Sequence, residues 1–303
     1  MTEIKAGRHK IEITHADKLY FPDTGITKEE VVNYYSDISD YILPHMKERA
    51  VTMHRFPDGI DGQDFYQHKV SDYFPDWIDT KALKKKEGGK IEHVICNNKA
   101  SLLYLVNQGC IVPHVWLSRV SKPDNPDKML FDLDPPENKF SLVKKAALKL
   151  KEEFEEIFDF PAFVMSTGSK GIHVVVPLDG KSDFDTTRKI AQIIAEKLAD
   201  ENSKSFTVEV RKNKRNGKLY IDTTRNAYSQ TSVVPYALRA LKDAPVAYPM
   251  DWEELKSKKF DPQKFNLKNI FKRLGQMDDP WKNFYKKKVK TDKLLNTVKD
   301  KYN

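Results

Sequence analysis

An apolar run that ends in two carboxylates is the feature that most constrains this chain. In the sequence FDLDPP, residues 131–136, a strand would place Asp132 and Asp134 on one face, because side chains alternate across a strand. Proline cannot donate to a sheet ladder, so the strand should end there with both carboxylates at its rim. Neighbouring carboxylates stay ionised only beside a cation, which predicts a divalent-metal site suited to phosphoryl transfer. For an isolated pair, the alternative is a loop-start pair that caps a helix.

A short glycine-containing segment, STGSKGIH at residues 166–173, lies between two apolar runs. Gly168 and Gly171 permit close backbone approach, so that consecutive N–H groups could converge on an anion. The segment lacks the length and the lysine position of a P-loop, and a plain hairpin turn is the alternative. Hydroxyl, ammonium and imidazole groups that could assist in binding a phosphate belong to Thr167, Ser169, Lys170 and His173.

A third carboxylate, Asp222, ends another predicted strand in KLYID, residues 218–222. A two-metal site needs a third aspartate beyond the first pair, because its two ions must both be held, about 4 Å apart. Further along, Arg239 could bind a triphosphate through two parallel hydrogen bonds. A turn-initiating aspartate and an arginine in a surface ion pair are the alternatives for these two residues.

Apolar periodicity predicts strands and helices that alternate through the middle of the chain. A capping box, Thr27 to Glu30, begins the first helix. A predicted hairpin of 206–210 and 219–222 favours an α+β fold with a mixed or antiparallel sheet over a doubly wound parallel fold. Helices are expected over 28–43 (with Pro44 just beyond its end), 99–108, 142–158, 185–199, 252–258 and 262–276, and strands over 111–117, 128–134, 162–165 and 173–178.

The positive charge of the chain is concentrated in a few places. The formal net charge is +8, and residues 281–303 hold eight lysines against two aspartates. Two further basic clusters, 81–90 and 204–218, contain glycine and are expected to be exposed loops; they favour nucleic-acid binding only if they flank a phosphate site. No run of eighteen apolar residues and no signal peptide is found, so an intracellular protein without membrane contact is expected. Cys96 and Cys110 match no zinc or disulfide pattern.

Together these motifs resemble a known family. FDLDPP, STGSKGIHVVVPL and YIDTTRN with TSVVPYALRA are similar to the three motifs of the archaeo-eukaryotic primase superfamily. The nearest resemblance is to the polymerase domain of the prokaryotic non-homologous end-joining ligase system, the ligase D type. It extends upstream through ADKLYFPDTGITK, HRFPDG, DFYQHK and VPHVW, and so covers about residues 8–250. A primase-polymerase domain over 1–250, with an RRM-like catalytic half, and a Lys-rich helical extension over 251–303 are therefore expected.

The resemblance implies a role for each matching residue. Two divalent ions, Mn²⁺ or Mg²⁺, would be held by the catalytic residues Asp132, Asp134 and Asp222. The NTP or dNTP substrate would be bound by Arg55, His114, Thr167, Gly168, Lys170, His173 and Arg239. Phe65 and Tyr66 would stack on a base. Lys18 and Lys28 would bind the 5′-phosphate on the far side of a gap.

Some positions depart from the family pattern. His54 stands where relatives often have lysine, and His68 precedes Lys69 where the reverse order is more common, which leaves open which of the two faces substrate. Arg225 replaces a more common glutamine. The ligase and nuclease domains that often accompany this module are not expected in this chain, and an ATP-dependent DNA ligase and a Ku-like protein are expected as separate partner chains.

The implied function is nucleotidyl transfer to a DNA 3′-OH during double-strand break repair by non-homologous end joining, with a preference for ribonucleotides. Double-stranded ends and gapped DNA with a 5′-phosphate would be the substrates, in the cytoplasm and nucleoid of a prokaryote. A replicative-type primase is the alternative within the superfamily. A non-catalytic DNA-end-binding module and a phosphatase of the haloacid-dehalogenase type are the alternatives outside it, and Pro135 and the STGSKG turn fit the phosphatase poorly.

Overall fold

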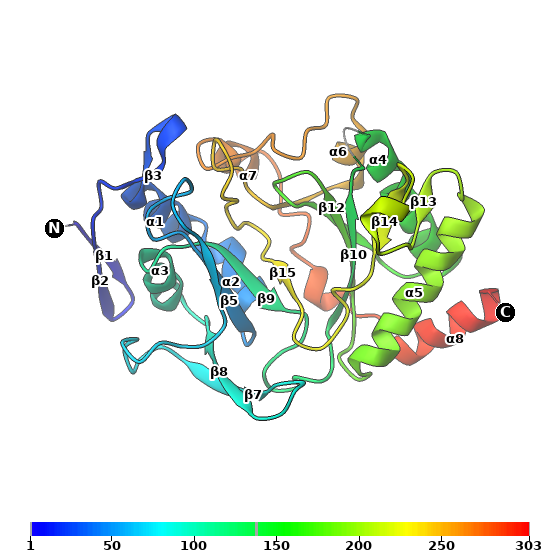
Figure 1. Ribbon diagram of the computed structural model, residues 1–303, viewed down its shortest axis with the longest axis horizontal. Helices are drawn as coiled ribbons and strands as arrows, with labels where there is room; N and C mark the ends of the chain where they lie inside the picture. Colours follow the sequence, from blue (N-terminus) through cyan, green and yellow to red (C-terminus); the bar gives the residue numbers. More distant parts are fainter. Residues whose placement is uncertain (1, 137–138, 303) are drawn as a thin grey trace. The chain divides into compact units, whose positions relative to one another are not determined.

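The computed structural model describes residues 2–136 and 139–302 and has the predicted α+β architecture (Figure 1). Its residues group into two compact units made of interleaved segments. Unit 1 takes the chain up to Ser121, then Thr231–Tyr248 and Phe265–Arg273; unit 2 takes Lys122–Gln230, Pro249–Lys264 and the chain from Leu274. The predicted boundary between a domain over 1–250 and an extension over 251–303 stays a prediction.

Unit 2 is built on a mixed sheet. Its strands follow the order β13-β14-β10-β12-β11-β16, with β10 antiparallel to both of its neighbours and β13 parallel to β14. The strand bounds are Lys128–Asp134 (β10), Phe163–Ser166 (β11), Ile172–Pro177 (β12), Phe206–Thr207 (β13), Leu219–Asp222 (β14) and Tyr248–Met250 (β16). The predicted hairpin of β13 and β14 is therefore wrong. An exposed loop joins the two strands, and bonds from the Arg215 guanidinium to two carbonyls of that loop hold it in place.

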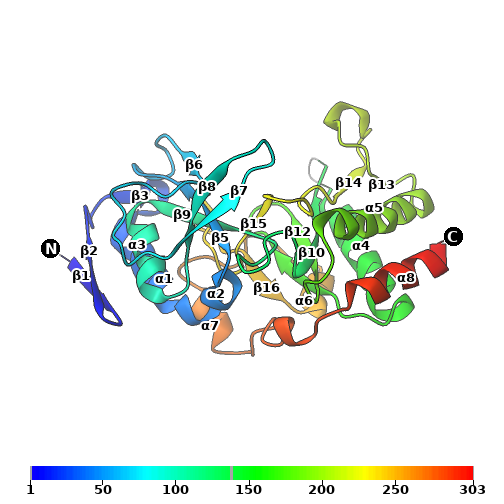
Figure 2. The ribbon, with the colours of Figure 1, turned by 90° about the horizontal axis from the view of Figure 1, so that it is seen from below.

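Two helices of unit 2, Phe140–Lys151 (α4) and Phe184–Glu201 (α5), pack against this sheet, and Thr291–Tyr302 (α8) packs against α5. Asp183 caps α5 by accepting a hydrogen bond from the Thr186 amide at 2.8 Å, and the apolar residues of α5 at helical spacing are buried. The helix predicted over 142–158 begins at Phe140 and changes to a π-helix from Glu152. The bounds are Phe140–Lys151 (α4), Glu152–Ile157 (π-helix), Phe184–Glu201 (α5), Lys212–Lys214 (3₁₀), Trp252–Lys256 (α6), Phe284–Lys286 (3₁₀) and Thr291–Tyr302 (α8) (Figure 2).

Unit 1 contains an antiparallel sheet in the order β15-β9-β5-β8-β7, with β6 paired to β5. Its strands are Ala50–Arg55 (β5), Phe65–Gln67 (β6), Thr80–Lys84 (β7), Lys90–Ile95 (β8), Cys110–Trp116 (β9) and Thr231–Val233 (β15). Two small hairpins complete its strands: Thr2–Ala6 (β1) with His9–Ile13 (β2), and Leu19–Phe21 (β3) with Ile26–Thr27 (β4). Its helices are Pro22–Thr24 (3₁₀), Lys28–Asp37 (α1), Ser39–Met46 (α2), Lys99–Asn107 (α3) and Ile270–Leu274 (α7).

The capping box at Thr27 and Glu30 is confirmed, with hydrogen bonds of 3.2 and 2.8 Å between side chains and backbone. The single helix predicted over 28–43 is instead two helices, and Pro44 lies inside the second. That helix ends two residues later, so the missing proline N–H removes little of its hydrogen-bond ladder. The helix predicted over 262–276 shrinks to α7, because Asp261 and Asn266 side chains accept from nearby backbone amides and favour turns.

Candidate functional site

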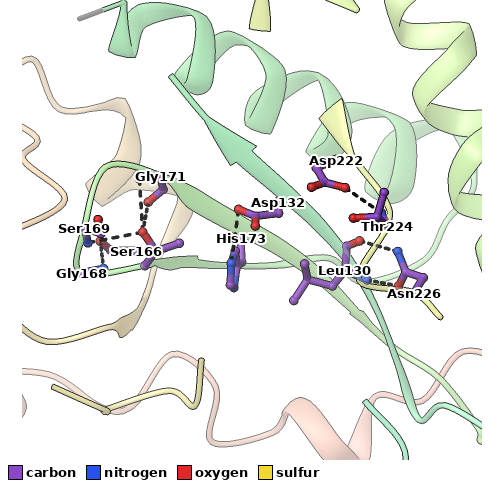
Figure 3. A network of polar contacts seen from close by, with 11 residues as sticks. Leu130, Asp132, Ser166, Gly168, Ser169, Gly171, His173, Asp222, Thr224 and Asn226 are labelled. Carbon is purple, nitrogen blue, oxygen red and sulfur yellow. Dashed lines mark hydrogen bonds and ion pairs between the residues drawn. The ribbon is translucent and has the colours of Figure 1, made fainter. Parts of the chain in front are cut away.

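The predicted carboxylates lie in a row across the sheet of unit 2. Asp132 on β10 is paired with His173 on β12 and with Asp222 on β14, so the three side chains share one face of three adjacent strands (Figure 3). Asp134 is two residues further along β10 and is the last residue of that strand. Pro135 follows at once, as the sequence predicted. We call Asp132, Asp134 and Asp222 the acidic row.

The acidic row has defined partners. Nε2 of His173 is 3.4 Å from Oδ1 of Asp132, and both side chains are largely buried, at 7% and 15% exposed. Oδ1 of Asp222 accepts a hydrogen bond from the Thr224 amide at 2.7 Å. Burial, reinforced by the negative charge of Asp222, raises the pKa of Tyr220 to about 12. Asp132 and Asp222 are half-buried, whereas Asp134 is exposed at the rim of the sheet, so the row is open to solvent at the end of β10.

The acidic row fits divalent cations by its chemistry. Carboxylate oxygens are the ligands that Mg²⁺ and Mn²⁺ prefer, and the pairing of β10 with β14 places two of them opposite each other. Within residues 2–136 and 139–302, no three acidic, histidine or cysteine side chains are yet close enough to enclose an ion. Asp222 is engaged by Thr224, so the fit rests on residue type and strand register.

The glycine-containing segment 166–171 is a loop closed by its own hydrogen bonds. The Gly168 amide donates to Oγ of Ser166 at 3.0 Å, and the Gly171 amide donates to Oγ1 of Thr167 at 3.2 Å (Figure 3). The Ser169 amide also points at Oγ1 of Thr167. These amides thus bond within the loop, which differs from the predicted convergence of N–H groups on a ligand. The hydroxyls of Ser166 and Thr167 are buried and donate to carbonyls, so the exposed ammonium of Lys170 and the half-buried hydroxyl of Ser169 are the groups that a phosphate could reach.

The loop and the acidic row touch at Gly171. A Cβ atom at this position would overlap Oδ1 of Asp134 and would stand 2.7 Å from the carbonyl oxygen of Leu133. Gly168 has a φ of 65°, which favours glycine, but the φ of Gly171 is not positive. Glycine is therefore needed at residue 171 for the close approach of the two segments and not for its backbone angle. Any side chain at residue 171 would push the Asp134 carboxylate away.

Hydrogen bonds from Asn226, Ser166 and Gln263, which the sequence did not predict, hold β10 and the loop 166–171 in place. Asn226, which is fully buried, accepts from the Leu130 amide at 2.8 Å and donates to the Leu130 carbonyl at 2.6 Å, and so clamps β10 two residues before Asp132. Oγ of Ser166 donates to the Pro262 carbonyl at 2.6 Å, and Nε2 of Gln263 donates to the Ser169 carbonyl at 3.1 Å. Asn226 lies within YIDTTRN and could have been found there. Gln263 carried no signal.

In unit 1, Lys18 and Lys28 line one pocket of about 230 Å³. Nζ of Lys28 donates to Oγ1 of Thr14 at 2.8 Å. Nζ of Lys18 is 2.8 Å from Oδ1 of Asp58 and also donates to the Pro57 carbonyl. We call this the lysine pocket. The structure thus brings together the two lysines that were predicted as one site from residues ten positions apart.

Burial sets the electrostatics of the lysine pocket. Burial, together with the nearby charge of Lys18, lowers the pKa of Lys28, which is 4% exposed, to about 8. Arg55 also lines the pocket, where its guanidinium donates to the Gln108 carbonyl at 2.7 Å and to Gln67 at 2.6 Å. A pocket that holds three cationic side chains against one exposed carboxylate, Asp58, favours an anion.

The predicted stacking residues are exposed on unit 1. Phe65 and Tyr66 on β6 are 43% and 54% exposed. Tyr66 stacks on His54 with ring centroids 4.0 Å apart, and its edge faces His114 at 5.9 Å. His54 is in turn bonded to Asp64. His54 therefore supports an aromatic platform, which gives this departure from the family pattern a structural role.

The remaining predicted residues are also placed in unit 1. Nδ1 of His68 is 3.0 Å from Oγ1 of Thr52, whose strand neighbour on β9 is His114. Both His68 and Lys69 are exposed, and partial desolvation lowers the pKa of His68. Arg239 lies beyond β15, and its amide donates to the Pro245 carbonyl at 2.7 Å. The nucleotide-binding residues predicted from sequence are thus divided between the two units.

Comparison with known proteins gives the family. A family model described as the LigD primase-polymerase domain matches residues 27–281. The chain belongs to this family. The resemblance found in the sequence is thereby confirmed, and the match continues past residue 250.

Relatives of LigD type cover most of the chain. The bifunctional non-homologous end joining protein LigD of Bacillus subtilis is 32% identical over 279 residues, or 91% of this chain and 44% of its own length. The multifunctional LigD of Mycolicibacterium smegmatis is 28% identical over 275 residues, or 89% of this chain and 35% of its own length. The chain therefore spans less than half of these relatives.

A solved structure has the same fold. The polymerase domain of Mycobacterium tuberculosis ligase D, solved in complex with DNA, superposes with a TM-score of 0.85 and 24% sequence identity, covering 92% of this chain and 99% of that one. The α+β primase-polymerase fold predicted from the sequence is confirmed by this likeness. Within the described ranges, no helix is long and apolar enough to cross a membrane.

Proposed function

We propose that this protein is a DNA-dependent nucleotidyltransferase that extends 3′ ends and fills gaps in double-strand break repair by non-homologous end joining. The observation that carries the proposal is the contact of the acidic row with the loop 166–171 at Gly171. Groups that suit cations and groups that suit phosphates are thereby adjacent within one unit. Membership of the LigD primase-polymerase family supports the same reaction.

The acidic row would hold two divalent ions, Mn²⁺ or Mg²⁺. When bound, such ions lower the pKa of a primer hydroxyl and neutralise charge on the leaving pyrophosphate. Asp132 is kept in place by its strand neighbours and by His173, whose ring also faces the side on which a triphosphate would lie. The protein contributes positioning and charge, which account for most of the catalysis in phosphoryl transfer.

The triphosphate would be bound by Lys170, Thr167, Gly168 and His173, with Arg239 as a further positive charge. Arg55, for which the resemblance implies the same role, lines the lysine pocket. His114 would lie near the sugar, consistent with its edge-on contact to Tyr66. Phe65 and Tyr66, both exposed, would stack on a base, which is worth roughly 1–3 kcal/mol per base and tolerates any sequence. A preference for ribonucleotides belongs to this proposal.

The lysine pocket would receive the 5′-phosphate on the far side of a gap. Its size, its two ammonium groups and the hydroxyl of Thr14 suit a phosphate monoester. DNA ends and gapped duplexes are the proposed nucleic-acid partners. The proposed protein partners are an ATP-dependent DNA ligase and a Ku-like protein. The proposed location is the cytoplasm and nucleoid of a prokaryote.

The test is incorporation of labelled NTP or dNTP on a gapped duplex with Mn²⁺, with and without a downstream 5′-phosphate. Extension that is stronger with the 5′-phosphate, and is absent in Asp132→Ala, supports the proposal. A phosphatase or a passive end-binding protein would incorporate nothing. A replicative-type primase would start chains on a template without a primer.

A further inference from the structure

A short basic segment follows the last residue matched by the family model. Residues 286–290 have the sequence KKKVK, and their four lysines are all exposed. The segment belongs to unit 2 and leads into α8 (Figure 2). We call Lys286, Lys287, Lys288 and Lys290 the basic run.

The backbone of the basic run is held by contacts just before it and by hydrogen bonds within it. Before it, the rings of Trp281 and Phe284 stack with centroids 4.7 Å apart, and Phe284 also contacts Phe163 on β11 at 5.0 Å. Within it, the Val289 amide donates to the Pro177 carbonyl at 2.9 Å, and the Val289 carbonyl accepts from the Asp179 amide at 2.9 Å. The run is therefore an ordered part of the surface.

The bridge at Val289 also decides which way the lysines point. Val289 is 3% exposed and pairs with Leu178 as a strand residue would. In an extended segment, the residues before and after an inward side chain point outward. Lys288 and Lys290 thus project together from the surface, and only their flexible stems lose freedom when they bind a ligand.

The positive charge of the basic run is not neutralised by the protein. No acidic side chain among the described residues lies within 4.0 Å of its four ammonium groups. Two acids of the adjoining segments have other hydrogen-bond partners: Asp179 accepts from Thr291, and Asp292 accepts from Ser182. By contrast, four other lysines of unit 2 are paired with glutamates at 2.6–3.2 Å, namely Lys149, Lys151, Lys197 and Lys256.

We propose that the basic run is a contact surface for the sugar-phosphate backbone of duplex DNA. Four unpaired ammonium groups on an ordered backbone match a partner that carries one charge per about 1.7 Å of helix axis. The run lies beside Leu178, at the end of β12 opposite to His173, and five residues of strand correspond to about 17 Å. That distance equals the rise of about five base pairs, so the run would contact the duplex away from the reacting end.

This inference rests on the proposed function only in taking DNA as the substrate. Its test is the binding of duplex DNA in the absence of NTP or dNTP. The variant K286Q/K287Q/K288Q/K290Q is compared with K149Q/K151Q/K197Q/K256Q, which removes the same charge from paired lysines. The affinity for a duplex of about 20 base pairs is measured as a function of salt concentration. Each lost phosphate contact lowers the slope of log K against log salt by about 0.9.

We expect the basic-run variant to lose about three units of slope and at least tenfold in affinity at about 100 mM salt, and the control variant to lose less than one unit. Equal losses in the two variants, or no loss in either, would overturn the inference. In both of those cases, extension by the wild-type protein would leave the proposed function intact. No binding of DNA by the wild-type protein would overturn both.

Discussion

The lysine pocket and the acidic row would both serve phosphates, yet they carry opposite charge. The pocket is complete in itself, because Lys28 is hydrogen-bonded to Thr14 and Lys18 to Asp58, and a phosphate needs only to replace Asp58. The acidic row places carboxylates opposite one another on β10 and β14, and it would repel a phosphate unless cations lie between them. One region binds anions directly, and the other does so only through a metal.

This difference separates two dependences that an extension assay normally mixes. Occupancy of the lysine pocket should respond to pH and to salt, because its cations are side chains that can lose a proton. The acidic row should respond to the concentration of divalent metal. Variants in one region should therefore leave the response of the other unchanged.

The largest effect is expected for Asp222→Asn, which removes one of the charges that would hold the ions. Loss of a metal ligand is expected to cost roughly 4 kcal/mol of transition-state stabilisation, or about a thousandfold in kcat. Single-turnover extension measures the loss, and the preference for a 5′-phosphate in DNA binding should be retained. The exposed Asp300 in α8 offers a control, Asp300→Asn. An Asp222→Asn protein with near-normal kcat would remove Asp222 from the metal site.

The next effect is expected for Gly171→Ala. The new Cβ would overlap Oδ1 of Asp134 and the carbonyl of Leu133, and only the side chain can move aside without bending β10. A displacement of about 1 Å at a reacting centre can cost about a hundredfold in rate, so kcat should fall by roughly 10- to 100-fold. The apparent affinity for metal should also weaken.

Gly7→Ala is the control for this substitution. No atom lies within 4 Å of the added methyl group, but its φ of +61° is strained for alanine. It should lower stability by about 1 kcal/mol and leave kcat unchanged. If both variants lost only stability, the contact between residue 171 and Asp134 would have no part in the reaction.

A smaller effect is expected from pH on the lysine pocket. Because the pKa of Lys28 is lowered to about 8, its charge is present below that pH and is lost as the pH rises through it. A phosphate monoester is already doubly charged above its second pKa near 6. The advantage in affinity that a 5′-phosphate gives to gapped DNA, roughly tenfold or more from a charged hydrogen bond, should therefore fall between pH 7 and pH 9.

Lys28→Met sharpens this measurement. It keeps the length of the side chain without the charge, so the ratio of affinities with and without the 5′-phosphate should be small and the same at every pH. The exposed Lys5 provides the control Lys5→Met, which should behave as the wild type. A wild-type ratio that does not change across this range would separate Lys28 from phosphate binding.

The smallest effect is expected for Asp58→Asn. Asp58 is 72% exposed, and ion pairs of this kind contribute about 0–1 kcal/mol. Removing the competing carboxylate should strengthen binding of the 5′-phosphate by about two- to fivefold, as measured by competition between gapped duplexes. Asp61→Asn, at another exposed position of the same loop, should change nothing. A weaker interaction in Asp58→Asn would mean that Asp58 holds Lys18 in its binding position.

Local sequence patterns predicted the parts of the site that are contiguous in the chain. The strand ending at Asp134, the capping box at Thr27 and the α+β class followed from side-chain alternation, capping and periodicity. The resemblance suggested that Asp132 and Asp222 belong to one site. The strand register then showed that they lie directly opposite each other on β10 and β14.

Contacts between distant segments could not be predicted in this way. The hydrogen bond from Gln263 to the Ser169 carbonyl joins residues 94 positions apart and leaves no periodic trace in the sequence. The parallel pairing of β13 was missed because two short strands joined by a loop with glycine are typical of a hairpin. The loop amides were misjudged because the hydroxyls of Ser166 and Thr167 compete with a ligand for them.

The interleaving of the two units limits how this protein can be divided and how it can arise. The chain passes between the units five times, at residues near 121, 230, 248, 264 and 273. No single cut therefore yields a fragment that contains all of one unit and nothing of the other, and residues 231–303 are divided between both units. A gene encoding this module can be fused at its ends to other domains, but exchange of one half by recombination would leave two incomplete cores.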